Sequence, residues 1–176
     1  MTRTFRRVVT GHNAAGRAIF ASDAQVPSLP LAGLPGTEIC DLWGSDTTFN
    51  YPDNGAKPAY EAFFPPVGGC RFLVFTVPPD SLGGAQAADA SPDALKAANP
   101  SLAQTMQADA PGMHRSETID MLYVISGACV LELDDGVRLD LKAGDTAIQS
   151  GTMHAWRNPH DEPCRVIAAI VGASLR

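Results

Sequence analysis

The chain lacks any long apolar run, and this absence limits where it can act. None of its hydrophobic stretches approaches the ~20 residues that a membrane-spanning helix requires. The opening MTRTFRRVVTG carries basic residues, but it lacks the apolar stretch and the small-residue cleavage site of a secretory signal. We therefore expect a cytoplasmic protein that has no membrane partner.

Positive charge is also scarce. The sequence holds 13 lysines and arginines against 19 aspartates and glutamates, for a formal net charge of -6. Apart from Arg3, Arg6 and Arg7, the basic residues are scattered along the chain. Because nucleic-acid binding requires a basic patch or stripe, we expect no nucleic-acid partner.

Paired cysteines are absent as well. Cys40, Cys70, Cys129 and Cys164 lie far apart, without a Cys-x-x-Cys pair. This spacing favours neither a zinc ribbon nor a small disulfide framework. We expect reduced thiols that pack as small hydrophobic side chains.

Short strand-like segments separated by turn residues are what the sequence has in abundance. From Asp120 onward they recur at roughly the 8–12-residue spacing of an all-β barrel or sandwich. The pattern is sharpest at 129–141, where apolar and polar residues alternate on both sides of the turn DDG. This alternation predicts a hairpin whose apolar face, including Val137, Leu139 and Leu141, lies in the core.

The N-terminal half is less regular. Residues 5–23 predict a hairpin, which either opens the fold or forms an arm that reaches another subunit. Residues 27–36 are too rich in proline and glycine for regular structure. The stretch CRFLVFTVPPD at 70–80 predicts a strand with apolar side chains on both faces, and such a strand is expected to be buried.

The segment at 81–112 differs in composition, because it is rich in alanine. Ser91 is a candidate helix N-cap, Pro92 suits the first helical position, and Pro100 should divide the segment into two short helices. Such a segment is either a surface insertion without chemistry or a lid over a site.

Two spaced patterns then flank the strands of the C-terminal half. The first comprises His114, Ser116, Asp120 and Gly127. The second comprises Gly144, Gly151, His154 and Asn158. Together they resemble the two motifs of single-domain cupins, and most closely a group of one-domain bacterial and fungal cupins to which no particular reaction is attached. Ser116 stands where the cupin motif has a second His, and Asp120 stands where it has Glu.

The resemblance implies an all-β fold, an antiparallel double-stranded β-helix (a jelly-roll barrel) with an N-terminal β arm and a short helical insertion. On this basis we expect residues 1–176 to form a single cupin domain. Its parts would be N-terminal strands and loops at 1–80, the insertion at 81–112, and the two motifs at 113–172. Cupins of this size pair their barrels, so the resemblance also implies a homodimer.

The resemblance further implies a metal site, because cupins bind a metal through three His and one Glu. Matched residue by residue, His114, Asp120 and His154 are the candidate metal ligands and catalytic residues, while Ser116 replaces a ligand. Two His and one carboxylate are able to hold one divalent ion such as Fe, Mn, Ni or Zn. The alternative is that both His are hydrogen-bonded barrel residues, with Asp120 orienting one imidazole for metal-free acid or base chemistry.

Three further residues are candidates for substrate contact, namely Ser116, Gln149 and Trp156. Trp156 follows His154 by two positions, so the two side chains share one face of a strand. Two functions remain open. The first is a small-molecule enzyme with oxygenase, isomerase, dehydratase or decarboxylase chemistry on an oxygenated organic substrate; the second is a metabolite-binding cupin without turnover.

Overall fold

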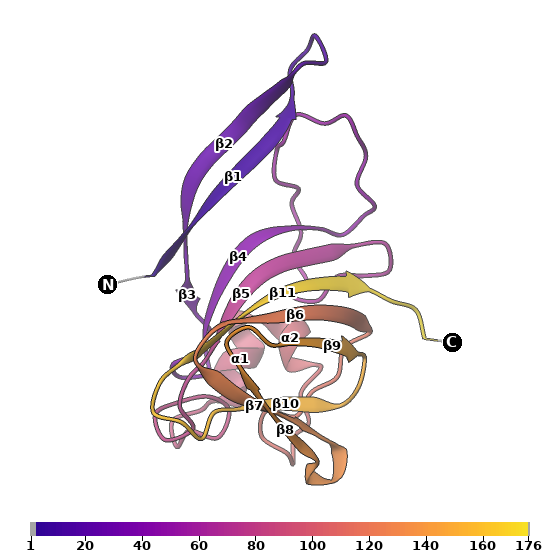
Figure 1. The fold of residues 1–176 in the computed structure, drawn as a ribbon. Helices are drawn as coiled ribbons and strands as arrows, with labels where there is room; N and C mark the ends of the chain where they lie inside the picture. Colours follow the sequence, from indigo (N-terminus) through magenta and orange to yellow (C-terminus); the bar gives the residue numbers. More distant parts are fainter. Residues whose placement is uncertain (1–2, 176) are drawn as a thin grey trace.

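The computed structural model describes residues 3–175, and nearly all of its regular structure is β-strand (Figure 1). The strands are β1 (Thr4–His12), β2 (Ala18–Pro27), β3 (Leu29–Pro30), β4 (Glu38–Ser45), β5 (Cys70–Val77), β6 (Thr118–Ser126), β7 (Ala128–Leu133), β8 (Arg138–Lys142), β9 (Thr146–Ser150), β10 (His154–Arg157) and β11 (Cys164–Gly172). A six-stranded sheet has the order β3-β4-β5-β11-β6-β9, and a three-stranded sheet has the order β10-β7-β8. All pairings within the two sheets are antiparallel, which confirms the predicted all-β fold.

The core lies between these two sheets and follows from strand alternation. Along β6, buried residues alternate strictly with exposed ones from Thr118 to Ile125. Because successive side chains point to opposite faces of a strand, the alternation that buries Leu122 and Val124 also turns Asp120 inward. From the smaller sheet, Cys129 and Leu141 close the same cluster.

The hairpin β7–β8 forms as predicted, but its burial does not follow the prediction. Val137 and Leu139 are 62% and 64% exposed, whereas Leu141 is 6% exposed. The strand β8 is the outer strand of the smaller sheet, and the hairpin tip projects away from the six-stranded sheet (Figure 1). Only Leu141, which pairs with the fully buried Cys129, reaches the core.

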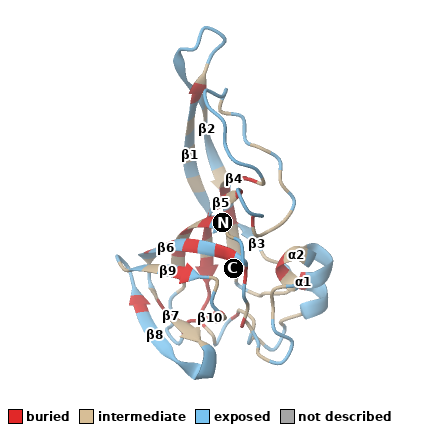
Figure 2. Cartoon of the chain, turned by 90° about the vertical axis from the view of Figure 1, so that its right-hand side faces the viewer, coloured by how far each residue is buried: buried red, intermediate tan, exposed pale blue. Residues whose placement is uncertain are grey.

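The predicted N-terminal hairpin is an arm made of β1 and β2. At its base, Phe5 and Val26 pack against a small cluster on the large sheet that includes Cys40 and Val74. The rest of the arm stands away from the sheets and is mostly exposed (Figure 2), and Phe20 is 80% exposed.

The segment before β6 contains the two expected helices, α1 (Pro92–Ala98) and α2 (Pro100–Ala103). The Ser91 hydroxyl accepts a hydrogen bond from the Ala94 amide, and Asn99 caps α2 in the same way. Leu95 and Leu102 anchor the two helices with 4% and 3% exposure. None of the helices in residues 3–175 is long and apolar enough to cross a membrane. Cys40, Cys129 and Cys164 are buried thiols, and Cys70 is partly buried.

Candidate functional site

The two motif histidines face each other across a short backbone bridge. The His114 amide donates to the His154 carbonyl at 2.9 Å, and the His154 amide donates to the His114 carbonyl at 3.0 Å. Residues that exchange both hydrogen bonds in an antiparallel pair project their side chains to the same face. The two imidazole centroids are accordingly 4.2 Å apart, so His114 and His154 share one site.

Each imidazole is fixed by a backbone carbonyl. Nδ1 of His114 lies 2.9 Å from the Gly112 carbonyl oxygen, and Nδ1 of His154 lies 3.0 Å from the Thr152 carbonyl oxygen. A carbonyl only accepts, so each Nδ1 carries the proton and donates it. In the neutral ring Nε2 is then a bare acceptor, and no hydrogen bond within residues 3–175 occupies Nε2 of either ring.

The surroundings keep both rings neutral near pH 7. Burial lowers the pKa of His114. Burial, together with repulsion from a charged His114, lowers the pKa of His154 to about 3. Burial in an apolar site disfavours the charged, protonated ring, so both imidazoles are neutral bases.

Asp120 is the third titratable group on the site, and it lies on β6 with 6% exposure. Its Oδ1 is buried without a hydrogen-bond partner. Burial raises the pKa of this carboxyl to about 6, against a smaller opposing effect of Thr118. No hydrogen bond joins Asp120 to either imidazole, so the expectation that Asp120 orients a ring is wrong; the backbone carbonyls of Gly112 and Thr152 do so.

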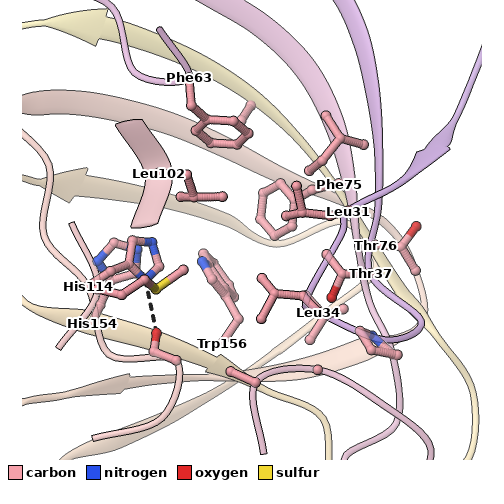
Figure 3. Close-up of a pocket in the computed structure, with 18 of the residues that line it drawn as sticks. Leu31, Leu34, Thr37, Phe63, Phe75, Thr76, Leu102, His114, His154 and Trp156 are labelled. Carbon is pink, nitrogen blue, oxygen red and sulfur yellow. Dashed lines mark hydrogen bonds between the residues drawn. The ribbon is translucent and has the colours of Figure 1, made fainter. Parts of the chain in front are cut away.

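These three side chains line one cavity of about 140 Å³. Its wall is mainly apolar, and Phe75 and Trp156 contribute rings whose centroids are 5.5 Å apart. Figure 3 shows the two imidazoles side by side at one end, with the Trp156 indole between them and Leu34. The remaining wall includes Leu31, Ile39, Phe63, Phe64, Leu102, Met106 and Ile170. The space is comparable to the ~150 Å³ cavity that accepts benzene in another protein.

Comparison with known proteins agrees with the motif spacing. A family model described as "Cupin domain" matches residues 104–170. Residues 104–170 are a cupin domain. This match spans both histidines and Asp120, and the predicted resemblance is therefore confirmed.

Curated relatives share only this part of the chain. Oryzines biosynthesis cluster protein J of Aspergillus oryzae is 47% identical over 49 residues, which cover 28% of this chain and 27% of the relative. The cupin-domain-containing oxidoreductase srdB of Neurospora crassa is 37% identical over 67 residues, 35% of this chain and 34% of the relative. The matched stretches thus span between a quarter and a third of these relatives.

Solved structures resemble the chain more widely but more weakly. The polyketide cyclase RemF from Streptomyces resistomycificus covers 86% of this chain and 82% of its own, with 16% identity and a TM-score of 0.46. A Cupin 2 conserved barrel domain protein from Salinispora arenicola covers 82% of both chains, with 17% identity and a TM-score of 0.44.

Two of the predicted substrate contacts lie outside the wall of the cupin cavity. The Ser116 hydroxyl is buried and pairs with the Thr118 hydroxyl at 2.7 Å. Gln149 is buried and donates to the Thr152 carbonyl at 3.1 Å, the same carbonyl that accepts from His154. Gln149 therefore helps to fix the carbonyl that orients His154, whereas Trp156 lines the cavity directly.

The segment between β5 and β6 covers part of the cavity. It contributes Gly84, Gln86, Leu102 and Met106 to the wall, as a lid over the site would. Sequence reasoning missed Arg157, which ties this segment down: its Nη1 donates to the Pro111 carbonyl at 2.7 Å and its Nε donates to Glu132 at 2.5 Å. The sequence signal that could have identified Arg157 is its position in the second motif, directly after Trp156.

The donor set does not form a complete metal site. Within residues 3–175, no three His, Cys, Asp or Glu side chains are grouped so that they could hold a metal ion. A catalytic zinc normally takes three protein ligands. The two imidazoles supply two, and Asp120 lies on the same cavity without joining them.

Proposed function

We propose that this cupin domain is an enzyme that transfers protons on a small, largely apolar, oxygen-bearing molecule. One observation carries the proposal: two neutral imidazoles with free Nε2 atoms lie side by side on a mainly apolar cavity. Mainly apolar pockets with a few convergent polar groups are where small molecules bind. A free Nε2 facing such a pocket is within reach of a proton on the bound molecule.

Of the polar groups that line the cavity, we assign the proton transfers to His114, His154 and Asp120. The histidine pair takes up one proton, because a second cation 4.2 Å away is opposed by the first. We assign this base to His114, because a charged His114 further lowers the pKa of His154. Asp120, whose pKa is raised to about 6, is suited to return a proton near neutral pH. Removal of a proton next to a carbonyl begins isomerisation and dehydration, and protonation of such a carbon after loss of CO2 completes decarboxylation.

The divalent ion that cupins often bind stays a prediction for this chain. Purification without chelator, followed by elemental analysis for Fe, Mn, Ni and Zn, tests it directly. The names of two relatives, a biosynthesis cluster protein and an oxidoreductase, support small-molecule chemistry without selecting a reaction.

Proton exchange in deuterated buffer tests the proposal. Small enolisable ketones that fit the cavity, such as cyclohexanone and 2-indanone, are incubated with chelator-treated protein, and loss of the α-proton signal is followed by NMR. We expect exchange above the buffer rate, loss of it in His114→Gln, and no change in His160→Gln, an exposed histidine outside the cavity.

Two other results would contradict the proposal. If a ketone binds, as seen from ligand line broadening, but is not exchanged, the cupin is a binding module. If exchange disappears on chelation and returns with one added divalent ion, a metal rather than the histidine pair activates the substrate.

A further inference from the structure

The large sheet has an apolar outer face that stays exposed in the single chain. Because successive side chains of a strand point to opposite faces, the residues that alternate with the cavity-facing ones form this outer face. The strand registers align one residue from each of β5, β11, β6 and β9 in a single row: Phe72, Ala169, Met121 and Ile148. The exposed apolar side chains of the face are Phe72, Ile119, Met121, Tyr123, Ile125, Ile148 and Val171. A contiguous apolar patch of this kind marks an interaction site rather than ordinary surface.

The outer face also carries little charge. Among the described residues, those that β6 and β9 turn outward include no acidic or basic side chain, although the whole chain has a net charge of -6. The strand β11 has a single charged residue, Arg165, near its beginning. Charged residues are depleted at the centre of protein interfaces, and homodimer interfaces are more apolar than other interfaces. The face therefore suits an apolar protein surface and not a charged partner.

The arm and the large sheet enclose a groove of about 580 Å³. The arm rises beside β4 and stands away from the sheets (Figure 1). Val9 lines the groove from the arm, and Trp43, Phe72 and Val171 line it from the large sheet. Because Phe72 and Val171 also belong to the exposed outer face, the groove and the face form one continuous surface.

The chain exposes more surface than a compact monomer of its mass. Its accessible surface is 10292 Å², whereas a folded monomer of 18.5 kDa is expected to expose about 8,200 Å². Obligate homodimers bury about 2,000–5,000 Å² in total, which is about 1,000–2,500 Å² from each copy. The excess of about 2,000 Å² therefore lies within the range that an obligate dimer removes from each copy.

We infer that a second copy of the chain covers this surface: the two large sheets pack by their outer faces, and the arm of each copy lies along the sheet of the other. A second copy supplies an equally apolar sheet face and an arm whose Phe20 is 80% exposed. Two-fold pairs use the same patch on both subunits, so each arm meets the sheet of the other copy. The contact also explains how the arm persists, because a two-stranded hairpin alone is at best marginally stable in water.

Sedimentation equilibrium of the full chain and of three lysine variants tests this interface. Met121→Lys places a charge on the sheet face and Phe20→Lys places one on the arm. Leu139→Lys, at an exposed apolar residue of the smaller sheet, is the matched control. We expect a wild-type dimer at micromolar concentration. The first two variants should each raise the dissociation constant at least about 100-fold, because each substitution occurs twice in a two-fold pair, and the control should raise it less than about threefold.

Oxidative footprinting with hydroxyl radicals locates the contact. In a lysine variant that is folded and monomeric, Tyr123 should be oxidised several-fold faster than in the wild-type dimer, whereas the exposed Val137 on the smaller sheet should react equally in both. Circular dichroism shows which variants are folded, and either Met121→Lys or Phe20→Lys is sufficient for the footprint if the other does not fold.

Three results would overturn the inference. A wild-type monomer at high protein concentration would show that a second copy does not cover the face. A dimer that both folded variants preserve would place the contact elsewhere on the molecule. A dimer that Met121→Lys dissociates but Phe20→Lys preserves would refute the contact made by the arm. Ketone exchange plays no part in these measurements, so the proposed catalysis can fail while the interface stands.

Discussion

Replacing Asp120 with asparagine should stabilise the protein at pH 8 relative to pH 4. The side chain is 6% exposed, and Oδ1 has no partner. Burial raises the pKa of the carboxyl to about 6 from its ordinary 3.8. Ionised Asp120 is therefore a cost that the folded state carries above that pH, and asparagine, which has nearly the same shape, cannot ionise.

The sign and size follow from proton linkage. Well below pH 3.8 the carboxyl is protonated in both folded and unfolded chains, and no cost arises. As the pH rises through 4 to 6 the unfolded chain ionises first, so the folded state loses stability. A difference of about two pK units corresponds to about 3 kcal/mol at full effect. Between pH 4 and pH 8 we expect the variant to gain about 2 kcal/mol over wild type.

Urea unfolding followed by tryptophan fluorescence measures this gain. The free energy of unfolding of Asp120→Asn minus that of wild type is taken at pH 4 and again at pH 8. Any constant cost of burying the amide cancels between the two values. Asp140→Asn, an exposed change on β8, is the matched control and should show less than about 0.5 kcal/mol. Equal values at both pH, or a loss at pH 8, would refute the assignment of Asp120 as an uncompensated buried acid.

Local chemistry explains why much of the fold was predictable. The turn DDG, the cap at Ser91 and the break at Pro100 act on neighbouring residues, so the sequence alone specifies them. The exposure of Val137 and Leu139 was not predictable in this way, since alternation shows which residues share a face but not whether another sheet covers that face.

The candidate site likewise has features that the sequence predicts and features that it does not. Motif spacing and strand parity were enough to expect His114 and His154 on one cavity. The opposite wall comes from segments such as 27–36. Its proline and glycine content predicts no regular structure, which is wrong for the end of β2 and for the two-residue strand β3, and gives no information about which residues the segment covers. Leu31 and Leu34 lie in that segment and line the cavity. The ring tautomers depend on the carbonyls of Gly112 and Thr152, which no side-chain motif records.

Two predictions concern the lid and the assembly. Arg157→Met should destabilise the fold by about 2–3 kcal/mol, because Glu132 loses its less exposed partner and keeps only Arg138, and it should speed amide hydrogen exchange across 84–112. Arg138→Met, which removes the exposed partner of Glu132, should cost at most about 1 kcal/mol in urea unfolding. Equal losses would show that Arg157 holds nothing in place. The homodimer remains a prediction. The arm of β1 and β2 supports it, because an isolated two-stranded hairpin is at best marginally stable in water. That arm exposes 80% of Phe20 while the outer face of the large sheet exposes 47% of Tyr123. We expect sedimentation to give a dimer that Tyr123→Lys dissociates, because a charge on that face opposes its burial against a second copy; a wild-type monomer at high protein concentration would refute this.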